Sequence, residues 1–141
     1  MGESGKGKTT VAQLSVETGH IALGDDLNFI IQVRPNDYKL GVAPSIVPTL
    51  SSYSMLNPSL RGIFKLTKDN HDELIQLSPR NIAKNLLESL KQIPKAASLS
   101  DQIFQNAFQT ISSIARAVPG YELHFRKSPD FWKLIDERFP D

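Results

Sequence analysis

Cysteine is absent from the 141 residues of this chain. Disulfide scaffolds, thiolate metal sites and cysteine nucleophiles are therefore excluded, and the composition fits a reducing compartment. A dominant charge is also missing, because 16 basic residues face 15 acidic ones, for a net charge of +1. Nucleic-acid binding and polybasic membrane binding lose their usual electrostatic basis, so we expect neither kind of partner.

Long apolar runs are missing as well. No stretch approaches the roughly 20 apolar residues of a membrane helix, and the opening MGESGKGKTT has no apolar core of a secretory signal. We therefore expect a cytoplasmic protein. The chain is 40% hydrophobic and 22% charged, which is ordinary for a folded protein, and we expect residues 1–141 to form one domain.

The expected secondary structure is mixed α/β. Apolar spacing and turn residues predict a helix over 9–17, strands over 20–23, 27–34, 38–42, 60–66 and 72–77, helices after Ser78 and Ser100, a strand over 121–125 and a short helix after Ser128. Short polar turns predict that 27–34 pairs with 38–42, and that 60–66 pairs with 72–77, as two hairpins. Residues 43–59 hold three prolines and five serines, which indicates a loop.

A phosphate-binding motif stands near the start of the chain. Residues 2–9, GESGKGKT, match the pattern G-x-x-x-x-G-K-[ST] at every fixed position. Glycines let successive backbone N–H groups turn inward around phosphate oxygens, and the following helix points its positive end at the same anion. In this pattern Lys8 reaches the β- and γ-phosphates, and the Thr9 hydroxyl coordinates Mg²⁺. The nucleotide-binding residues that we predict are Gly2, Ser4, Gly5, Lys6, Gly7, Lys8, Thr9 and Thr10.

A pair of adjacent acids, Asp25-Asp26, follows the predicted strand over 20–23. Side chains at the carboxyl ends of strands in open α/β sheets point into the ligand crevice, so we expect the pair to face the phosphate loop. One carboxylate then serves as a Mg²⁺ ligand, and the other accepts a proton from an attacking hydroxyl. Two adjacent acids also raise each other's pKa, which suits a base. The structural alternative is a solvated turn or a helix cap.

The phosphate loop, the helix after it and the segment GHIALGDD over 19–26 together resemble HPr kinase/phosphorylase and its relatives, which share a fold with phosphoenolpyruvate carboxykinase. The segments LRGIFKL and VPGYELHFRKSPDFW are similar to HPr-kinase-like serine kinases of peptide-modification gene clusters. The resemblance covers most of the chain and is strongest over 2–26. It implies a P-loop, phosphoenolpyruvate-carboxykinase-like mixed sheet with hairpins and flanking helices.

The resemblance also implies an activity, namely transfer of the γ-phosphoryl group of ATP to a serine hydroxyl of a protein or peptide. Carried over residue by residue, the phosphate-binding residues are Gly5, Gly7, Lys8 and Thr9. The catalytic set is Lys8, Asp25 and Asp26. Thr9 and one of the two aspartates, for which we take Asp26, hold Mg²⁺, and the other aspartate acts as the base.

Three departures from the family pattern modify this expectation. HPr kinase carries a functional histidine before its phosphate loop and a glycine-rich signature after it, and neither is visible here. A loop of this kind normally follows a buried strand, whereas only Met1 precedes Gly2. We therefore expect a monofunctional, kinase-like relative that is N-terminally truncated relative to the family. The sheet edge left by a missing strand favours pairing with a second copy of the chain.

Two other function classes compete with the kinase. The first is a nucleotide-binding but non-catalytic module, a truncated or degenerate kinase, which the missing strand favours and the intact Lys8, Thr9 and aspartate pair oppose. The second is a switch that hydrolyses a nucleotide, for which no glutamine or arginine is clearly placed to orient water.

Several other side chains have both a functional and a structural interpretation. Arg61 is a candidate for stabilising phosphate charge, against an ordinary solvated arginine, and Arg126 with the lysine after it favours a solvated pair over a substrate contact. The three histidines are too scattered to indicate a metal site, and His71 and His124 are expected to face solvent. Phe131 and the tryptophan after it have the spacing of core residues.

Overall fold

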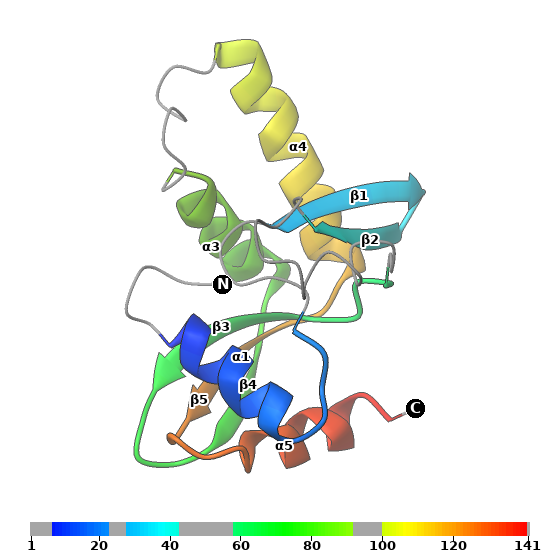
Figure 1. Cartoon of the computed structure of the whole chain (residues 1–141). Helices are drawn as coiled ribbons and strands as arrows, with labels where there is room; N and C mark the ends of the chain where they lie inside the picture. Colours follow the sequence, from blue (N-terminus) through cyan, green and yellow to red (C-terminus); the bar gives the residue numbers. More distant parts are fainter. Residues whose placement is uncertain (1–6, 23–27, 43–57, 92–99, 141) are drawn as a thin grey trace.

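The computed structural model describes residues 7–22, 28–42, 58–91 and 100–140. This part of the chain is mixed α/β, as the sequence predicted, with four helices and two small sheets (Figure 1). The helices are α1 (Lys8–Glu17), α3 (Pro79–Lys91), α4 (Asp101–Ala117) and α5 (Phe131–Arg138). The strands are β1 (Asn28–Arg34), β2 (Asp37–Val42), β3 (Ile63–Lys68), β4 (Glu73–Leu77) and β5 (Gly120–Phe125).

Strands β1 and β2 form the first predicted hairpin. They pair antiparallel, with Ile30 opposite Leu40, and the turn contains Asn36 at a φ of 63°. Asparagine tolerates this left-handed backbone better than most residues, which explains its place in the turn. The hairpin prediction is therefore confirmed.

The second predicted hairpin is wrong. Strands β3 and β4 both form, but β5 lies between them, parallel to β3 and antiparallel to β4. The reason is burial, because β5 carries the most deeply buried residues of the three strands and takes the central place. Two strand spacings amount to about 10 Å, a gap that the four residues 69–72 can span.

The predicted strand over 20–23 is also not seen in its described part, residues 20–22. Here the chain leaves α1 by folding back on it: the backbone N–H of His20 donates to the carbonyl oxygen of Ser15 at 2.9 Å. The His20 ring then stacks on Trp132, with 3.5 Å between ring centroids. These contacts hold the segment against α1 and α5 and away from the sheet.

Serine caps begin two of the helices, as predicted. The Ser100 hydroxyl accepts from the backbone N–H of Ile103 at the start of α4, and the Ser78 hydroxyl accepts from that of Asn81 at the start of α3. Such caps satisfy backbone donors that the helix itself leaves without partners. None of the helices in the described ranges is long and apolar enough to span a membrane.

Two apolar clusters flank the three-stranded sheet. On one side α1 and α5 pack against Leu66, Leu123 and Phe125, and Phe131 of α5 is fully buried, as the sequence predicted. On the other side α3 and α4 pack on each other and on the amino-terminal ends of β3 and β5, around Ile63. At the carboxyl-terminal ends of β3 and β5 that second side carries polar residues instead, among them Thr67 and His124.

Candidate functional site

The first turn of α1 contains the described part of the predicted phosphate-binding motif. Gly7 is the N-cap residue, with a left-handed φ of 103°, and its carbonyl oxygen accepts the N–H of Val11 at 2.8 Å. Lys8, Thr9 and Thr10 form the opening turn, which contains no acidic residue. The predicted helix is thus confirmed, with its start one residue earlier than expected.

Gly7 lies against the carboxyl ends of the two parallel strands. A methyl group on Gly7 would sit 2.5 Å from Cζ of Phe125 and 3.2 Å from Cε of Lys68, the last residues of β5 and β3. Glycine is therefore required there for both its backbone angle and its size. The start of α1 consequently lies at the sheet edge where open α/β folds bind their ligands.

This arrangement fits an anion such as a nucleotide phosphate. The N–H groups of a first helical turn point beyond the helix end, where the helix dipole is positive. The exposed Thr9 supplies a hydroxyl, an oxygen ligand suited to Mg²⁺. The remaining predicted residues, Gly2, Ser4, Gly5, Lys6, Asp25 and Asp26, lie outside the described residues.

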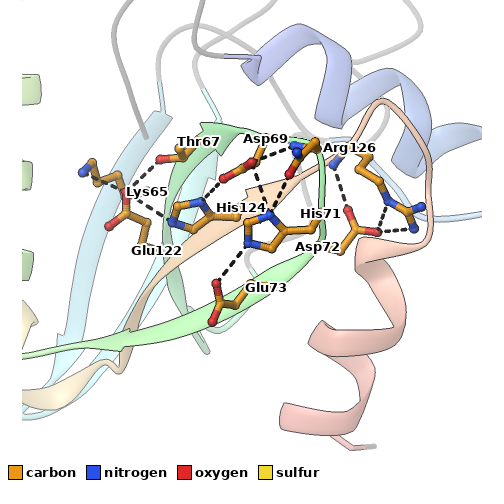
Figure 2. Close-up of polar contacts among 10 residues, drawn as sticks. Lys65, Thr67, Asp69, His71, Asp72, Glu73, Glu122, His124 and Arg126 are labelled. Carbon is orange, nitrogen blue, oxygen red and sulfur yellow. Dashed lines mark hydrogen bonds and ion pairs between the residues drawn. The ribbon is translucent and has the colours of Figure 1, made fainter.

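A second group of polar side chains lies on the opposite side of β5 (Figure 2). Glu122 accepts hydrogen bonds from Lys65 at 3.0 Å and from the Thr67 hydroxyl at 2.8 Å, both across to β3. The Thr67 hydrogen bond and, after it, Lys65 hold the pKa of Glu122 below its usual value against the opposing effect of burial.

Beyond this pair, Asp69, His71 and His124 come together at the end of the sheet. Oδ2 of Asp69 is 2.8 Å from Nδ1 of His124, and Oδ1 is 3.2 Å from Nδ1 of His71. The two imidazole rings stack with centroids 5.8 Å apart. The hydrogen bond to His124, with help from the Asn70 N–H, lowers the pKa of Asp69. We call Asp69, His71 and His124 the histidine cluster.

The histidine cluster brings together two of the three histidines that the sequence predicts to be scattered, whereas His20 lies elsewhere, stacked on Trp132. Because β5 inserts between β3 and β4, His124 lies beside the β3–β4 turn that carries His71. The His71 side chain is 52% exposed, as expected, whereas that of His124 is 19% exposed and so faces solvent less than predicted. The alternation of β5 is a sequence signal for which of its residues share a face. The pairing of β5 with β3 and β4, which brings His124 near His71, was not predicted.

The turn between β3 and β4 is held at both ends. The Asp69 N–H donates to the carbonyl oxygen of Phe125 at 3.0 Å. Asp72 accepts from the backbone N–H of Arg126 at 2.8 Å and from its guanidinium at 2.7 and 3.0 Å. The same hydrogen bonds raise the pKa of Arg126. Arg126 is therefore half-exposed, and it also holds this turn in place through Asp72.

Arg61 occupies a different place. Its guanidinium donates to the carbonyl oxygen of Pro140 at 3.1 Å and lies over the Phe139 ring, 5.9 Å from its centroid. It therefore binds the segment after α5, and its predicted role at a transferring phosphate receives no support from these contacts.

Comparisons of the chain with protein-family models, with curated proteins and with solved structures return no significant match. Function is therefore inferred from the motif and from the described geometry.

Proposed function

We propose that the chain is an ATP- and Mg²⁺-dependent phosphotransferase that moves the γ-phosphoryl group to a serine hydroxyl of a protein or peptide. The single observation that supports this most is the packing of Gly7 on Phe125 and Lys68. It places the end of a G-x-x-x-x-G-K-[ST] motif at the carboxyl edge of two parallel strands, where such loops bind phosphate. An HPr-kinase-like fold of the phosphoenolpyruvate-carboxykinase type is part of the same proposal.

Each motif residue has a defined role in this proposal. Lys8 would hold β- and γ-phosphate oxygens, and Thr9 would bind the metal ion together with Asp26. Asp25 would accept the proton of the serine hydroxyl, and the two aspartates exchange roles in the alternative assignment. ATP with Mg²⁺ supplies the transferable phosphoryl group and neutralises part of its charge. The chain's own residues contribute positioning and fixed positive charge.

Nucleotide binding is tested first, by thermal unfolding with and without Mg·ATP. At about 100 times the dissociation constant, a ligand adds about 2.7 kcal/mol to the free energy of unfolding. We expect this stabilisation in the parent protein and its loss in Lys8→Ala. Lys84→Ala, which removes an exposed lysine of α3, is the matched control and should keep the shift. A parent protein that unfolds cooperatively without any shift would overturn the proposal.

Catalysis is tested separately, by following the γ-phosphoryl group of labelled ATP into a library of serine-containing peptides. Asp25→Asn and Asp26→Asn should each keep the Mg·ATP-dependent stabilisation, and at least one should abolish transfer. Stabilisation without transfer in the parent, unchanged by either variant, would instead identify a nucleotide-binding module without catalysis.

A further inference from the structure

The histidine cluster has the composition of a transition-metal site. Two imidazoles and one carboxylate each offer a ligand atom, and these three atoms lie within 4.8 Å of one another. Zn²⁺ binds imidazole nitrogen and carboxylate oxygen at about 2.0–2.2 Å. Two of the three atoms lie 2.8 Å apart and no pair is separated by more than 4.8 Å, so all three can reach a single ion placed between them.

Outer carboxylates face the nitrogens that a metal would leave unused. Nε2 of His71 is 3.2 Å from Oε2 of Glu73, and Nε2 of His124 is 3.9 Å from Oε1 of Glu122. Metal-binding histidines usually donate their second N–H to such a group, which fixes the tautomer and makes the ligand more basic. On the side away from Asp69, His71 therefore has a carboxylate within hydrogen-bond distance, whereas the Glu122 carboxylate lies near His124 but beyond that distance (Figure 2).

Local charge also favours a cation. Three carboxylates, those of Asp69, Glu73 and Glu122, surround the two imidazoles, whereas Lys65 is the ammonium that pairs with this group. A divalent ion would offset the excess negative charge.

The ligands are also held in place before any ion arrives. Asp69 directly follows β3 and its backbone N–H donates to the carbonyl oxygen of Phe125 in β5, and His124 lies within β5 itself. His71 lies on the short turn that the Asp72–Arg126 contacts fix at its far end. Ligands supplied by rigid strands and a braced turn bind a metal with less loss of entropy.

We propose that Asp69, His71 and His124 bind a divalent transition metal of the Zn²⁺ class. Three protein ligands leave at least one coordination position for water or a bound molecule, an arrangement typical of reactive rather than purely structural metal sites. The exposed His71 keeps that position accessible from solvent.

This site is independent of the proposed nucleotide site. Phe125 supports Gly7 on one side of β5, whereas the neighbouring His124 belongs to the other side, because successive side chains of a strand alternate. The metals also differ, since imidazole ligands suit Zn²⁺ and oxygen ligands suit Mg²⁺. Either proposal can therefore fail without the other.

Cobalt(II) is a suitable probe, because its visible absorption reports nitrogen ligation and a compact coordination geometry. The full chain is treated with a chelator and titrated with Co²⁺, and Zn²⁺ is then added in competition. We expect one equivalent of Co²⁺ to give visible absorption that Zn²⁺ removes. His71→Ala and His124→Ala should each weaken binding by more than tenfold. Glu73→Gln keeps all three ligands and should weaken it by about tenfold, the lower end of outer-carboxylate effects.

Two controls separate the cluster from incidental binding and from misfolding. His20→Ala removes the histidine that stacks on Trp132 and should bind Co²⁺ like the parent. Lys8→Ala should also keep Co²⁺ binding, so a failure of the nucleotide proposal remains distinguishable. If His71→Ala unfolds at a lower temperature than the parent, His71→Gln gives the same comparison with a hydrogen-bonding side chain. A parent without this absorption, or with the same absorption in the His71→Ala/His124→Ala double variant, would overturn the site.

Discussion

The two sides of β5 differ in nearly every physical respect, although their residues alternate along one strand. Tyr121, Leu123 and Phe125 are almost completely buried on the side that α1 and α5 cover. Glu122 and His124 lie on the other side, partly exposed and bonded to charged groups of β3 and its following turn. We call these the apolar side and the polar side of β5.

One strand can therefore contribute to stability on one side and to chemistry on the other. Burial of large apolar groups contributes about 1.5–3 kcal/mol each, whereas partly exposed ion pairs contribute about 0–1 kcal/mol. At the carboxyl-terminal end of β5 the apolar side should therefore contribute more folding free energy than the polar side, and Phe125 supports the start of α1. The polar side can then gather carboxylates and imidazoles at little cost to the fold.

The largest effect is expected from Phe131→Ala on the apolar side. Phe131 is fully buried and packs edge-to-face on Phe125, so its removal should lower the free energy of unfolding by about 3–5 kcal/mol. Glu122→Gln on the polar side keeps the side-chain shape and should cost less than about 1 kcal/mol. Urea unfolding of both variants measures the contrast. Equal losses would show that the two sides share the stability, contrary to the comparison.

An intermediate effect is expected from Gly7→Ala, where the apolar side meets α1. Alanine at a φ of 103° costs about 1–2 kcal/mol, and its methyl group would also collide with Phe125, adding about 1–3 kcal/mol. Gly19→Ala is the matched control, since its φ is 88° but nothing lies within 4 Å of the added carbon. Its cost should be the conformational part alone.

A double-mutant cycle sharpens the Gly7 result. Phe125→Leu shortens the side chain that an alanine at position 7 would strike, so it should recover part of the loss caused by Gly7→Ala. If the two losses in the free energy of unfolding are strictly additive in urea unfolding, Gly7 does not pack against Phe125 of β5. The support that β5 gives to the start of α1 would then be absent.

Local signals in the sequence were sufficient for most helices and strands of the described part. Ser78 and Ser100 predicted the starts of their helices, because capping depends only on neighbouring residues. β-Branched and aromatic residues predicted β1, the turn after it predicted β2, and alternation predicted β5, for the same reason. Strand order depends instead on which strand is buried most, and this is settled by α1, α3, α4 and α5 acting together. The prediction of a hairpin from 60–66 and 72–77 was wrong because it did not place β5 between these two strands.

The two candidate sites differ in the same way. The phosphate-binding motif is contiguous, so sequence reasoning found Gly7, Lys8 and Thr9 directly. The histidine cluster joins residues 55 positions apart, Asp69 and His124, across a parallel strand pair. Parallel pairing leaves no short turn between its strands to mark it, and so nothing in the sequence brought these residues together.

The smallest effect is expected at the rim where β5 leaves the sheet for α5. The Ser128 hydroxyl donates to Asp130 at 2.8 Å, and this bond, followed by that from Lys133, lowers the pKa of Asp130 below 3.8. A lowered folded-state pKa stabilises the protein above about pH 3.8, and this contribution disappears as the pH falls through the folded value.

Ser128→Ala should therefore raise the pKa of Asp130, which NMR titration measures, and slightly reduce the free energy of unfolding at pH 7. The stability difference from the parent should shrink as the solution is acidified below pH 3.8, because a protonated Asp130 gains less from the lost donor. A difference that is constant with pH would mean that Ser128 acts through turn geometry rather than charge. A loss in the free energy of unfolding as large as that of Phe131→Ala would contradict the difference between the two sides, because an exposed polar contact would then contribute as much as a buried apolar side chain.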